Sequence, residues 1–172
     1  MSSDAVAAPL VVLGLGNPMR GDDAAGLKVA EAVEHLLRER PLDGVAVRTS
    51  TRAGFDLIDL LAGSSLAIVV DCLILPNPIP GRVRRLTPDD FAGSARLAGA
   101  HAVSLADALT LATATGVPMP SVVEVYGIEA AETGWIDDRL SPAVAAAIPG
   151  VAREVHARLL AAAAAGLPGP AR

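Results

Sequence analysis

The sequence predicts an α/β protein with a twisted, mainly parallel sheet covered by helices on both faces. Strand-like segments alternate with segments of helical periodicity, which is the order that builds parallel sheets. Residues 9–15 and 66–71 are apolar on both faces, as parallel strands between helix layers are. Of the 172 residues, 52% are hydrophobic and only 2% are aromatic. We therefore expect one domain over residues 1–172, with a core of Ala, Val, Leu and Ile.

The first half of the chain contains two helical segments that alternate with three strands. Residues 23–39 place apolar and charged side chains on opposite sides at helical spacing. Residues 54–63 form a shorter helix, which ends at its final glycine. The strands that flank these helices are residues 9–15, 44–51 and 66–71. This order predicts two successive β-α-β connections.

The third strand is followed by a turn-rich loop, LPNPIPG, at residues 75–81. Residues 82–86 alternate as an edge or hairpin strand does. A helix is expected over 104–115, with Ser104 as its N-terminal cap, and residues 121–129 form the last strand.

The C-terminal part of the chain is rich in alanine and helical in pattern. We expect two helices after Ser141, separated by the Pro-Gly pair at 149–150. Residues 1–8 and 166–172 are expected to be flexible tails.

Composition excludes several classes of partner. The chain carries 14 Lys and Arg against 19 Asp and Glu, a net charge of −5, unlike the basic surfaces of nucleic-acid binders. No apolar run approaches the ~20 residues of a membrane helix, and no basic residue precedes the apolar residues 5–16 as in a signal peptide. The single cysteine, Cys72, excludes an internal disulfide and favours a reducing compartment. We expect a cytoplasmic protein with neither nucleic-acid nor membrane partners.

The glycine-rich turn GLGNPMRGDDAAG follows the first strand and resembles a dinucleotide-binding fingerprint only in part. That fingerprint needs glycine at positions 14, 16 and 19, and position 19 is Met. Asp22 and Asp23 stand where the helix N-terminus would bind a phosphate, and their charges would repel it. We assign Asp22 to the helix start, as a cap or a partner of the helix dipole.

Three polar residues are candidates for one site at the carboxyl edge of the sheet. Asp23 follows the first strand, Asp71 ends the third, and His101 lies in a loop before the next helix. One imidazole and two carboxylates suit a divalent metal such as nickel, zinc or manganese. Cys72, the neighbour of Asp71, is expected to be a small buried filler that points to the opposite side.

Four blocks of the sequence resemble the hydrogenase maturation proteases, the endopeptidases that trim the large subunit of nickel–iron hydrogenases. The blocks are GLGNPMRGDDAAG, AIVVDCL, HAVSLADAL and VYGIEAAETGWIDDRLSPAVAAAIPGVAREV. The resemblance implies a three-layer αβα sandwich with a five-stranded sheet in which one strand is antiparallel. It also implies a metal site formed by Asp23, Asp71 and His101.

The resemblance further implies the reaction and the partner. The substrate is the precursor of the large subunit, from which a short C-terminal peptide is removed after nickel insertion. Nickel arrives with the substrate, held by its thiolates, and the isolated protein could also hold another divalent metal. We expect a monomer that binds this precursor.

The chemistry that these residues favour is attack by water, because no Ser or Cys with an ordered base nearby is evident. Either Asp23 or Asp71 could be the base, and nickel would either polarise the reacting groups or only anchor the substrate tail. Asn17 is a candidate for binding the scissile region, although its place in the turn favours turn formation.

Two alternatives from other classes remain open. One is a nickel-dependent checkpoint or chaperone that binds the large subunit without cleaving it. The other is a nucleotide-binding α/β protein, against which the Asp22–Asp23 pair already argues.

Overall fold

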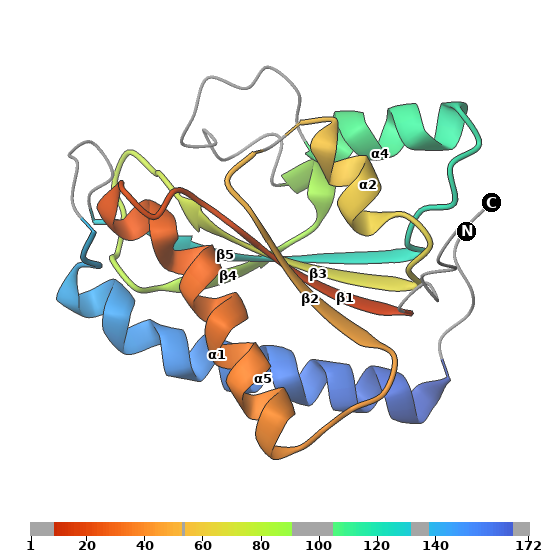
Figure 1. Cartoon of the computed structure of the whole chain (residues 1–172). Coiled ribbons are helices and arrows are strands. Elements are labelled where there is room, and N and C mark those ends of the chain that lie inside the picture. Colours follow the sequence, from red (N-terminus) through yellow and green to blue (C-terminus); the bar gives the residue numbers. More distant parts are fainter. Residues whose placement is uncertain (1–8, 53, 91–104, 132–137, 167–172) are drawn as a thin grey trace.

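The computed structural model describes residues 9–52, 54–90, 105–131 and 138–166. Its centre is a five-stranded sheet with the strand order β2-β1-β3-β5-β4 (Figure 1). Four strands run parallel, and β4 runs antiparallel to β5, as predicted. The strands are β1 (Leu10–Leu15), β2 (Val45–Ser50), β3 (Leu66–Leu73), β4 (Val83–Leu86) and β5 (Val122–Glu129).

Helices cover both faces of this sheet and complete the predicted three layers. The bounds of the helices on one face are α1 (Ala25–Glu39) and α5 (Pro142–Ala165), and those on the other are α2 (Asp56–Leu61) and α4 (Leu105–Ala114) (Figure 1). Two hydrophobic cores, one on each face, are built from aliphatic side chains, with Tyr126 as the one buried aromatic side chain among the described residues. The low aromatic content therefore suffices because the sheet contributes Val, Leu and Ile to both cores.

The strand order reverses at β1. Leu10 of β1 pairs with Val45 of β2 on one side and with Leu66 of β3 on the other. The chain therefore leaves β1 toward one edge of the sheet and later returns to the opposite side of β1. Such a switch point opens a crevice beyond the carboxyl ends of the two strands, which is where ligands bind in open α/β sheets.

Helix α5 is continuous, so the prediction of two helices separated at 149–150 is wrong. Side chains at helical spacing on both sides of Pro149 are buried in the same core, among them Val144, Ile148, Val151, Val155 and Leu159. Burial of each large aliphatic side chain contributes about 1.5–3 kcal/mol, whereas a proline inside a helix costs about 3 kcal/mol. The continuous apolar face outweighs the local break.

Other boundaries differ by a few residues. The helix predicted over 23–39 is divided into a 3-10 turn, η1 (Gly21–Ala24), and α1, and β3 continues two residues past Asp71. Ser104 and the tail residues 1–8 and 167–172 lie outside the described residues. Within the described part, no helix is long and apolar enough to cross a membrane.

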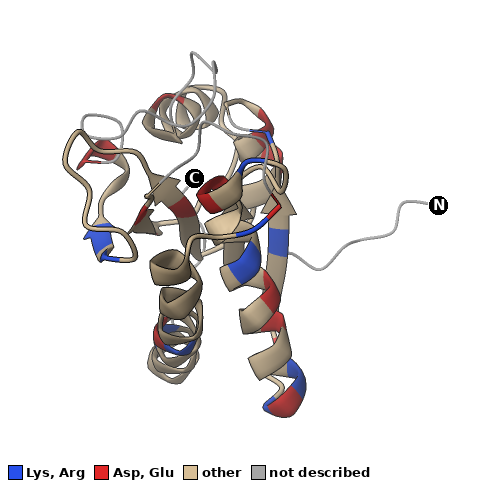
Figure 2. Cartoon of the chain, turned by 90° about the vertical axis from the view of Figure 1, so that its left-hand side faces the viewer, with Lys and Arg blue, Asp and Glu red and all other residues tan. Residues whose placement is uncertain are grey.

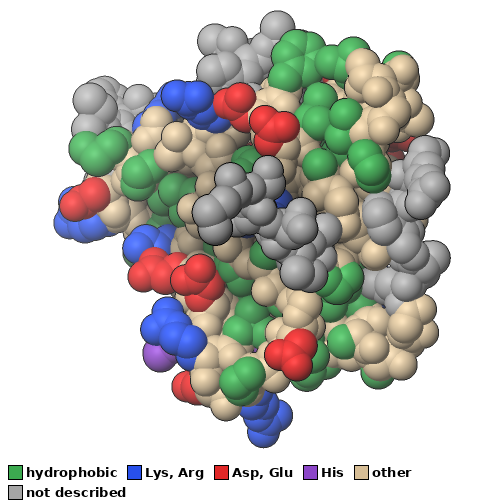
Figure 3. Space-filling view, turned by 45° about the vertical axis from the view of Figure 1, so that its right-hand side comes forward, with side chains coloured by type: hydrophobic (Ala, Val, Ile, Leu, Met, Phe, Trp, Pro, Cys, Tyr) green, Lys and Arg blue, Asp and Glu red, His purple; other side chains and the backbone are tan. Residues whose placement is uncertain are grey.

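The polar side of α1 faces solvent. Lys28 and Glu31 form an exposed ion pair at 2.9 Å, one helical turn apart. In the space-filling view, acidic and basic side chains stand next to one another on this face and do not gather into areas of one sign (Figure 3). This helix therefore divides its residues as its periodicity predicts, with Val29 and Val33 buried in the core.

Candidate active site at the carboxyl edge of the sheet

The turn after β1 brings the start of α1 unusually close to the sheet. A Cβ atom on Gly26 would lie 2.2 Å from the carbonyl oxygen of Val70 in β3, so only glycine fits there. Gly16 has a φ of +146°, and a Cβ on it would lie 1.9 Å from the carbonyl oxygen of Asp23. The glycines of the motif therefore allow close contact between helix and sheet, and they set η1 directly against the end of β3.

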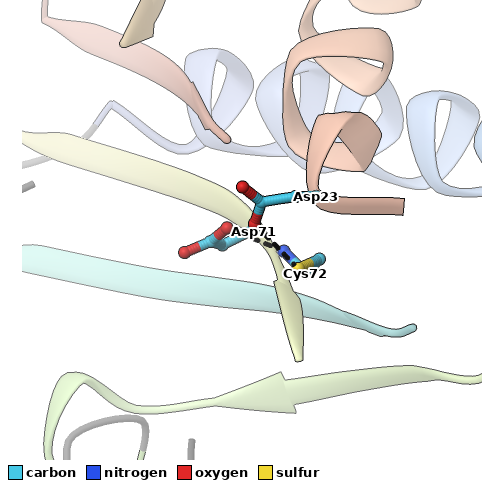
Figure 4. A group of neighbouring side chains, drawn as sticks. All are labelled: Asp23, Asp71 and Cys72. Carbon is cyan, nitrogen blue, oxygen red and sulfur yellow. Dashed lines mark hydrogen bonds between the residues drawn. The ribbon is translucent and has the colours of Figure 1, made fainter. Parts of the chain in front are cut away.

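Figure 2 faces this edge of the sheet, toward which β1 and β3 run. Asp23 comes from η1 and Asp71 from β3, and their side chains meet at the switch point (Figure 4). Ligand atoms of Asp23, Asp71 and Cys72 all lie within 4.8 Å of one another. The two aspartates are only 4% and 6% exposed, so both carboxyl groups are largely withdrawn from water.

Cys72 contacts both carboxyl groups. Its thiol donates a hydrogen bond to Oδ1 of Asp23, with Sγ and Oδ1 3.3 Å apart. Its backbone N–H donates to Oδ1 of Asp71 over 2.8 Å. Cys72 is buried in the core with Val70, as expected, but its thiol also binds Asp23, a contact that the sequence did not predict.

Burial dominates the electrostatics of this group. It raises the pKa of Asp71 to about 7; the hydrogen bond from Cys72 N–H opposes this rise, and the nearby Asp23 adds to it. Burial also raises the pKa of Asp23, against the Cys72 thiol, the charge of Arg20 and the backbone of Asn17. The pKa of the Cys72 thiol is raised by burial and by both carboxylates, which keeps it protonated. A carboxyl group that titrates near neutral pH is suited to accept a proton or to bind a cation.

The donor set suits a borderline divalent cation. Two carboxylates offer oxygen ligands to a divalent cation, and the Cys72 sulfur lies beside them as a hydrogen-bond donor. His101, the third predicted ligand, lies outside the described residues. The structure thus brings together two of the three predicted ligands, Asp23 and Asp71. It also places beside them the sulfur of Cys72, which the sequence did not predict to lie in the site.

Asn17 serves the turn. Its side-chain oxygen accepts a hydrogen bond from the backbone N–H of Met19 at 3.0 Å, and its carbonyl oxygen accepts one from Arg20 at 3.2 Å. These contacts fix the chain reversal between β1 and η1. Binding of the scissile region by Asn17 remains a prediction.

Asp22 lies in the first turn of η1, as predicted, but it does not cap its own helix. Neither η1 nor α1 has a side-chain cap, and the buried carboxylate of Asp22 accepts bonds from distant residues. The donors are the N–H of Ala131 at 2.8 Å and the N–H and hydroxyl of Ser141 at 2.7 and 2.9 Å. Asp22 therefore ties η1 to the end of β5 and to the start of α5.

Two histidines outside the site lie in helices and differ in exposure. His156 in α5 is only 9% exposed and lies beneath the sheet, with no partner for its Nε2 atom among the described residues. His35 on α1 is exposed, as its helical position predicts.

The fold and the site together define a class of protein, the open α/β proteins that place their reactive groups at a topological switch point. Comparison with known proteins gives the family. The sequence model of the hydrogenase maturation proteases matches residues 28–158, and the chain belongs to this family. Hydrogenase 2 maturation protease from Escherichia coli (strain K12) is 28% identical over 120 residues, which are 69% of this chain and 71% of that protein.

Solved structures agree with this assignment. The hydrogenase maturating endopeptidase HybD from E. coli is similar with a TM-score of 0.73 and 26% identity, over 94% of this chain and 96% of that chain. A hydrogenase 2 maturation peptidase from Thaumarchaeota archaeon SCGC_AB-539-E09 gives a TM-score of 0.58 and 28% identity, over 87% of this chain and 97% of the other. The family and the fold that the sequence blocks implied are thus confirmed, and the members of this family are peptidases.

Proposed function

We propose that this chain removes a C-terminal peptide from the large-subunit precursor of a nickel–iron hydrogenase after nickel has been inserted. The observation that carries this proposal is the meeting of Asp23 and Asp71 at the β1–β3 switch point, where they lie within 4.8 Å of each other and are largely buried. Membership of the maturation protease family supports the class of substrate. His101 would complete the site as a third group.

The proposed reaction is hydrolysis with Asp71 as the general base. Its pKa of about 7 allows the carboxylate to take a proton from water near neutral pH. The water oxygen bonds to the scissile carbonyl carbon as Asp71 takes the proton, and a tetrahedral intermediate forms. When that intermediate collapses, the C–N bond breaks and the proton passes from Asp71 to the leaving amine.

Nickel enters this proposal as part of the substrate. The precursor's own thiolates hold the ion, and carboxylate oxygens of Asp23 and Asp71 would occupy positions that these thiolates leave open. The two half-sites then bind more tightly together than either binds alone, because the second contact is intramolecular. This arrangement makes nickel loading a condition for cleavage.

The test compares precursors with and without nickel. Purified, metal-stripped protein is incubated with each form of a large-subunit precursor, and intact masses are measured before and after. We expect the nickel-loaded precursor to lose its C-terminal peptide and the nickel-free precursor to keep it. Efficient cleavage of the nickel-free precursor, or binding without cleavage of the loaded one, would overturn the proposal. The second outcome would identify a nickel-dependent checkpoint.

We also propose that the protein acts as a cytoplasmic monomer with a single domain. The lone Cys72 and the two cores on a common sheet support this proposal. Light scattering of the purified protein, alone and with precursor, tests the monomeric state. A stable dimer in both samples would contradict it.

A further inference from the structure

Cys72 engages one oxygen of each site carboxylate. The thiol donates to Oδ1 of Asp23 at 3.3 Å, and the N–H donates to Oδ1 of Asp71 at 2.8 Å. Both contacts come from one residue on β3, although the two acceptors lie 48 positions apart in the chain. The residue is 2% exposed, so water does not compete for these bonds.

Among the described residues, no hydrogen bond joins the second oxygen of either carboxylate. In Figure 4, Asp23 and Asp71 each turn one oxygen toward Cys72 and the other away from it. A carboxylate whose first oxygen accepts a hydrogen bond has its rotation about the final bond restricted, and its second oxygen then points in a defined direction. One ligand oxygen of Asp23 and one of Asp71 lie within 4.8 Å of each other, so a single ion between the two carboxylates could be bound by both.

We propose that Cys72 is a positioning residue that orients both site carboxylates, so that they are presented together to a divalent cation. This inference rests on the proposed function, in which that cation is the substrate's nickel. Nothing in the family's name or in the role assigned to the two aspartates requires a thiol here.

The thiol acts as a donor and not as a ligand. A thiol that keeps its proton donates to a carboxylate, whereas a metal-bound sulfur must lose that proton. In the structure the Cys72 sulfur is the donor of the bond to Oδ1 of Asp23, and it points at that carboxylate oxygen. Removing a residue that hydrogen-bonds to a metal ligand typically lowers metal affinity or activity by about 10–100-fold.

The test uses three variants of the full chain. Cys72→Ala removes the S–H donor and keeps the N–H, and Cys72→Ser replaces the donor by a hydroxyl. Val70→Ala is the matched control, because Val70 lies two residues earlier on β3, is fully buried in the same core and makes no side-chain hydrogen bond. Melting temperatures establish that all variants fold.

The first readout is Co²⁺ binding without substrate, measured by titration and by absorption. We expect Cys72→Ala to bind Co²⁺ about 10–100-fold more weakly, Cys72→Ser to recover most of the affinity, and Val70→Ala to match the original protein. We expect no thiolate-to-cobalt charge-transfer band. Such a band that disappears in Cys72→Ser would overturn the proposal by making Cys72 a ligand. Unchanged affinity in Cys72→Ala, or no Co²⁺ binding by the original protein at millimolar concentration, would also overturn it.

The second readout is processing of nickel-loaded precursor. We expect kcat of Cys72→Ala to fall about tenfold, with partial rescue in Cys72→Ser. Unaltered kcat and KM in Cys72→Ala would contradict the positioning role. If the original protein binds Co²⁺ as expected but cleaves no precursor, the proposed function fails while the role of Cys72 toward the carboxylates stands.

Discussion

Two buried carboxylates on neighbouring strands have opposite electrostatic environments. Asp71 on β3 pairs in register with Gly127 on β5, two residues before Glu129. Glu129 is fully buried and accepts hydrogen bonds from Nε of Arg82 at 2.5 Å, from Nε of Arg84 at 2.8 Å and from the N–H of Ile79 at 2.6 Å. Within the described chain, no Lys or Arg is in ion-pair contact with Asp71.

The difference appears in their protonation. Burial alone raises the pKa of a carboxyl group, and at Asp71 it raises the pKa to about 7. At Glu129 burial acts in the same direction, but the hydrogen bonds from Arg82, Ile79 and Arg84 overcome it and lower the pKa to about 2. Glu129 is therefore a charged structural group, whereas Asp71 titrates near neutral pH.

This comparison distinguishes a buried carboxylate with a structural role from buried carboxylates that are candidates for catalysis. Glu129 joins the loop at 75–81 and strand β4 to the end of β5, and its charge is neutralised within the protein. Among the described residues, Asp71 and Asp23 accept hydrogen bonds from Cys72 and form no ion pair, and Arg20 acts on Asp23 only through its nearby charge. The position of arginine, and not burial, marks which carboxylate is the candidate for catalysis.

The largest expected effect is on processing. Asp71→Asn and Asp23→Asn should each slow cleavage of nickel-loaded precursor by at least about 100-fold, since a general base or cation ligand is lost. Both variants should melt no lower than the original protein at pH 8, because a buried charge without a counterion has been removed. A mass-based cleavage assay and thermal unfolding measure the two quantities. Normal cleavage by either variant would show that the substituted carboxylate is not needed for the reaction.

The next largest effect should be on the stability of Glu129→Gln. This change removes the charge that Arg82 and Arg84 share, and it should lower the free energy of unfolding by about 1–3 kcal/mol. Glu124→Gln is the matched control on the same strand, because Glu124 binds the half-buried Arg158 at 2.7 Å and should lose only about 0.2–1 kcal/mol. Urea unfolding of both variants compares them. Equal losses would show that burial of Glu129 adds nothing to its ion pairs.

Asp22→Asn sharpens the comparison within the Asp22–Asp23 pair. An amide keeps one acceptor oxygen but turns an NH₂ group toward the N–H donors of Ala131 and Ser141. We expect a loss of about 1–2 kcal/mol in the free energy of unfolding, with processing much less impaired than in Asp23→Asn. Parallel unfolding and cleavage assays decide this. Equal loss of cleavage in both variants would show that the two acids share one role.

The most diagnostic effect is the pH dependence of the melting temperature of metal-free protein. Because the pKa of Asp71 is raised from 3.8 to about 7, the folded state holds a proton that the unfolded state has lost, and its contribution to stability falls as pH rises through this range. Because the pKa of Glu129 is lowered from 4.5 to about 2, its contribution is present above pH 4.5 and is lost as pH falls toward 2.

Scanning calorimetry from pH 3 to pH 8 measures how the melting temperature changes with pH on the acid side and on the neutral side. For a chain of this size, a change of 1 kcal/mol in the free energy of unfolding shifts the melting temperature by roughly 2–4 °C. Asp71→Asn should flatten only the neutral side, and Glu129→Gln only the acid side. If one variant flattened both sides, the two carboxylates would be coupled and not independent.

The sequence by itself determined the order of strands and helices, the α/β class and the family. Helical periodicity and the apolar patterns of β1 and β3 depend on neighbouring residues alone. The local sequence was therefore sufficient to predict these helices and strands. It also placed Asp23 and Asp71 at strand ends that a parallel sheet must bring to one edge. Their meeting at the switch point follows from topology, which the alternation of elements already implied.

Only the tertiary structure decided what the polar neighbours do. The local sequence around Asp22 predicts a helix cap, but in the fold Asp22 binds Ala131 and Ser141. The local sequence around Cys72 predicts a buried apolar residue, but in the fold its sulfur binds Asp23 of η1. Proline disfavours the interior of a helix, so local propensity predicts a helix end at Pro149. Burial of the apolar face of α5 against the sheet outweighs that preference. In each case the deciding partner lies far away in the chain, and hydrogen bonding and burial depend on distance in space.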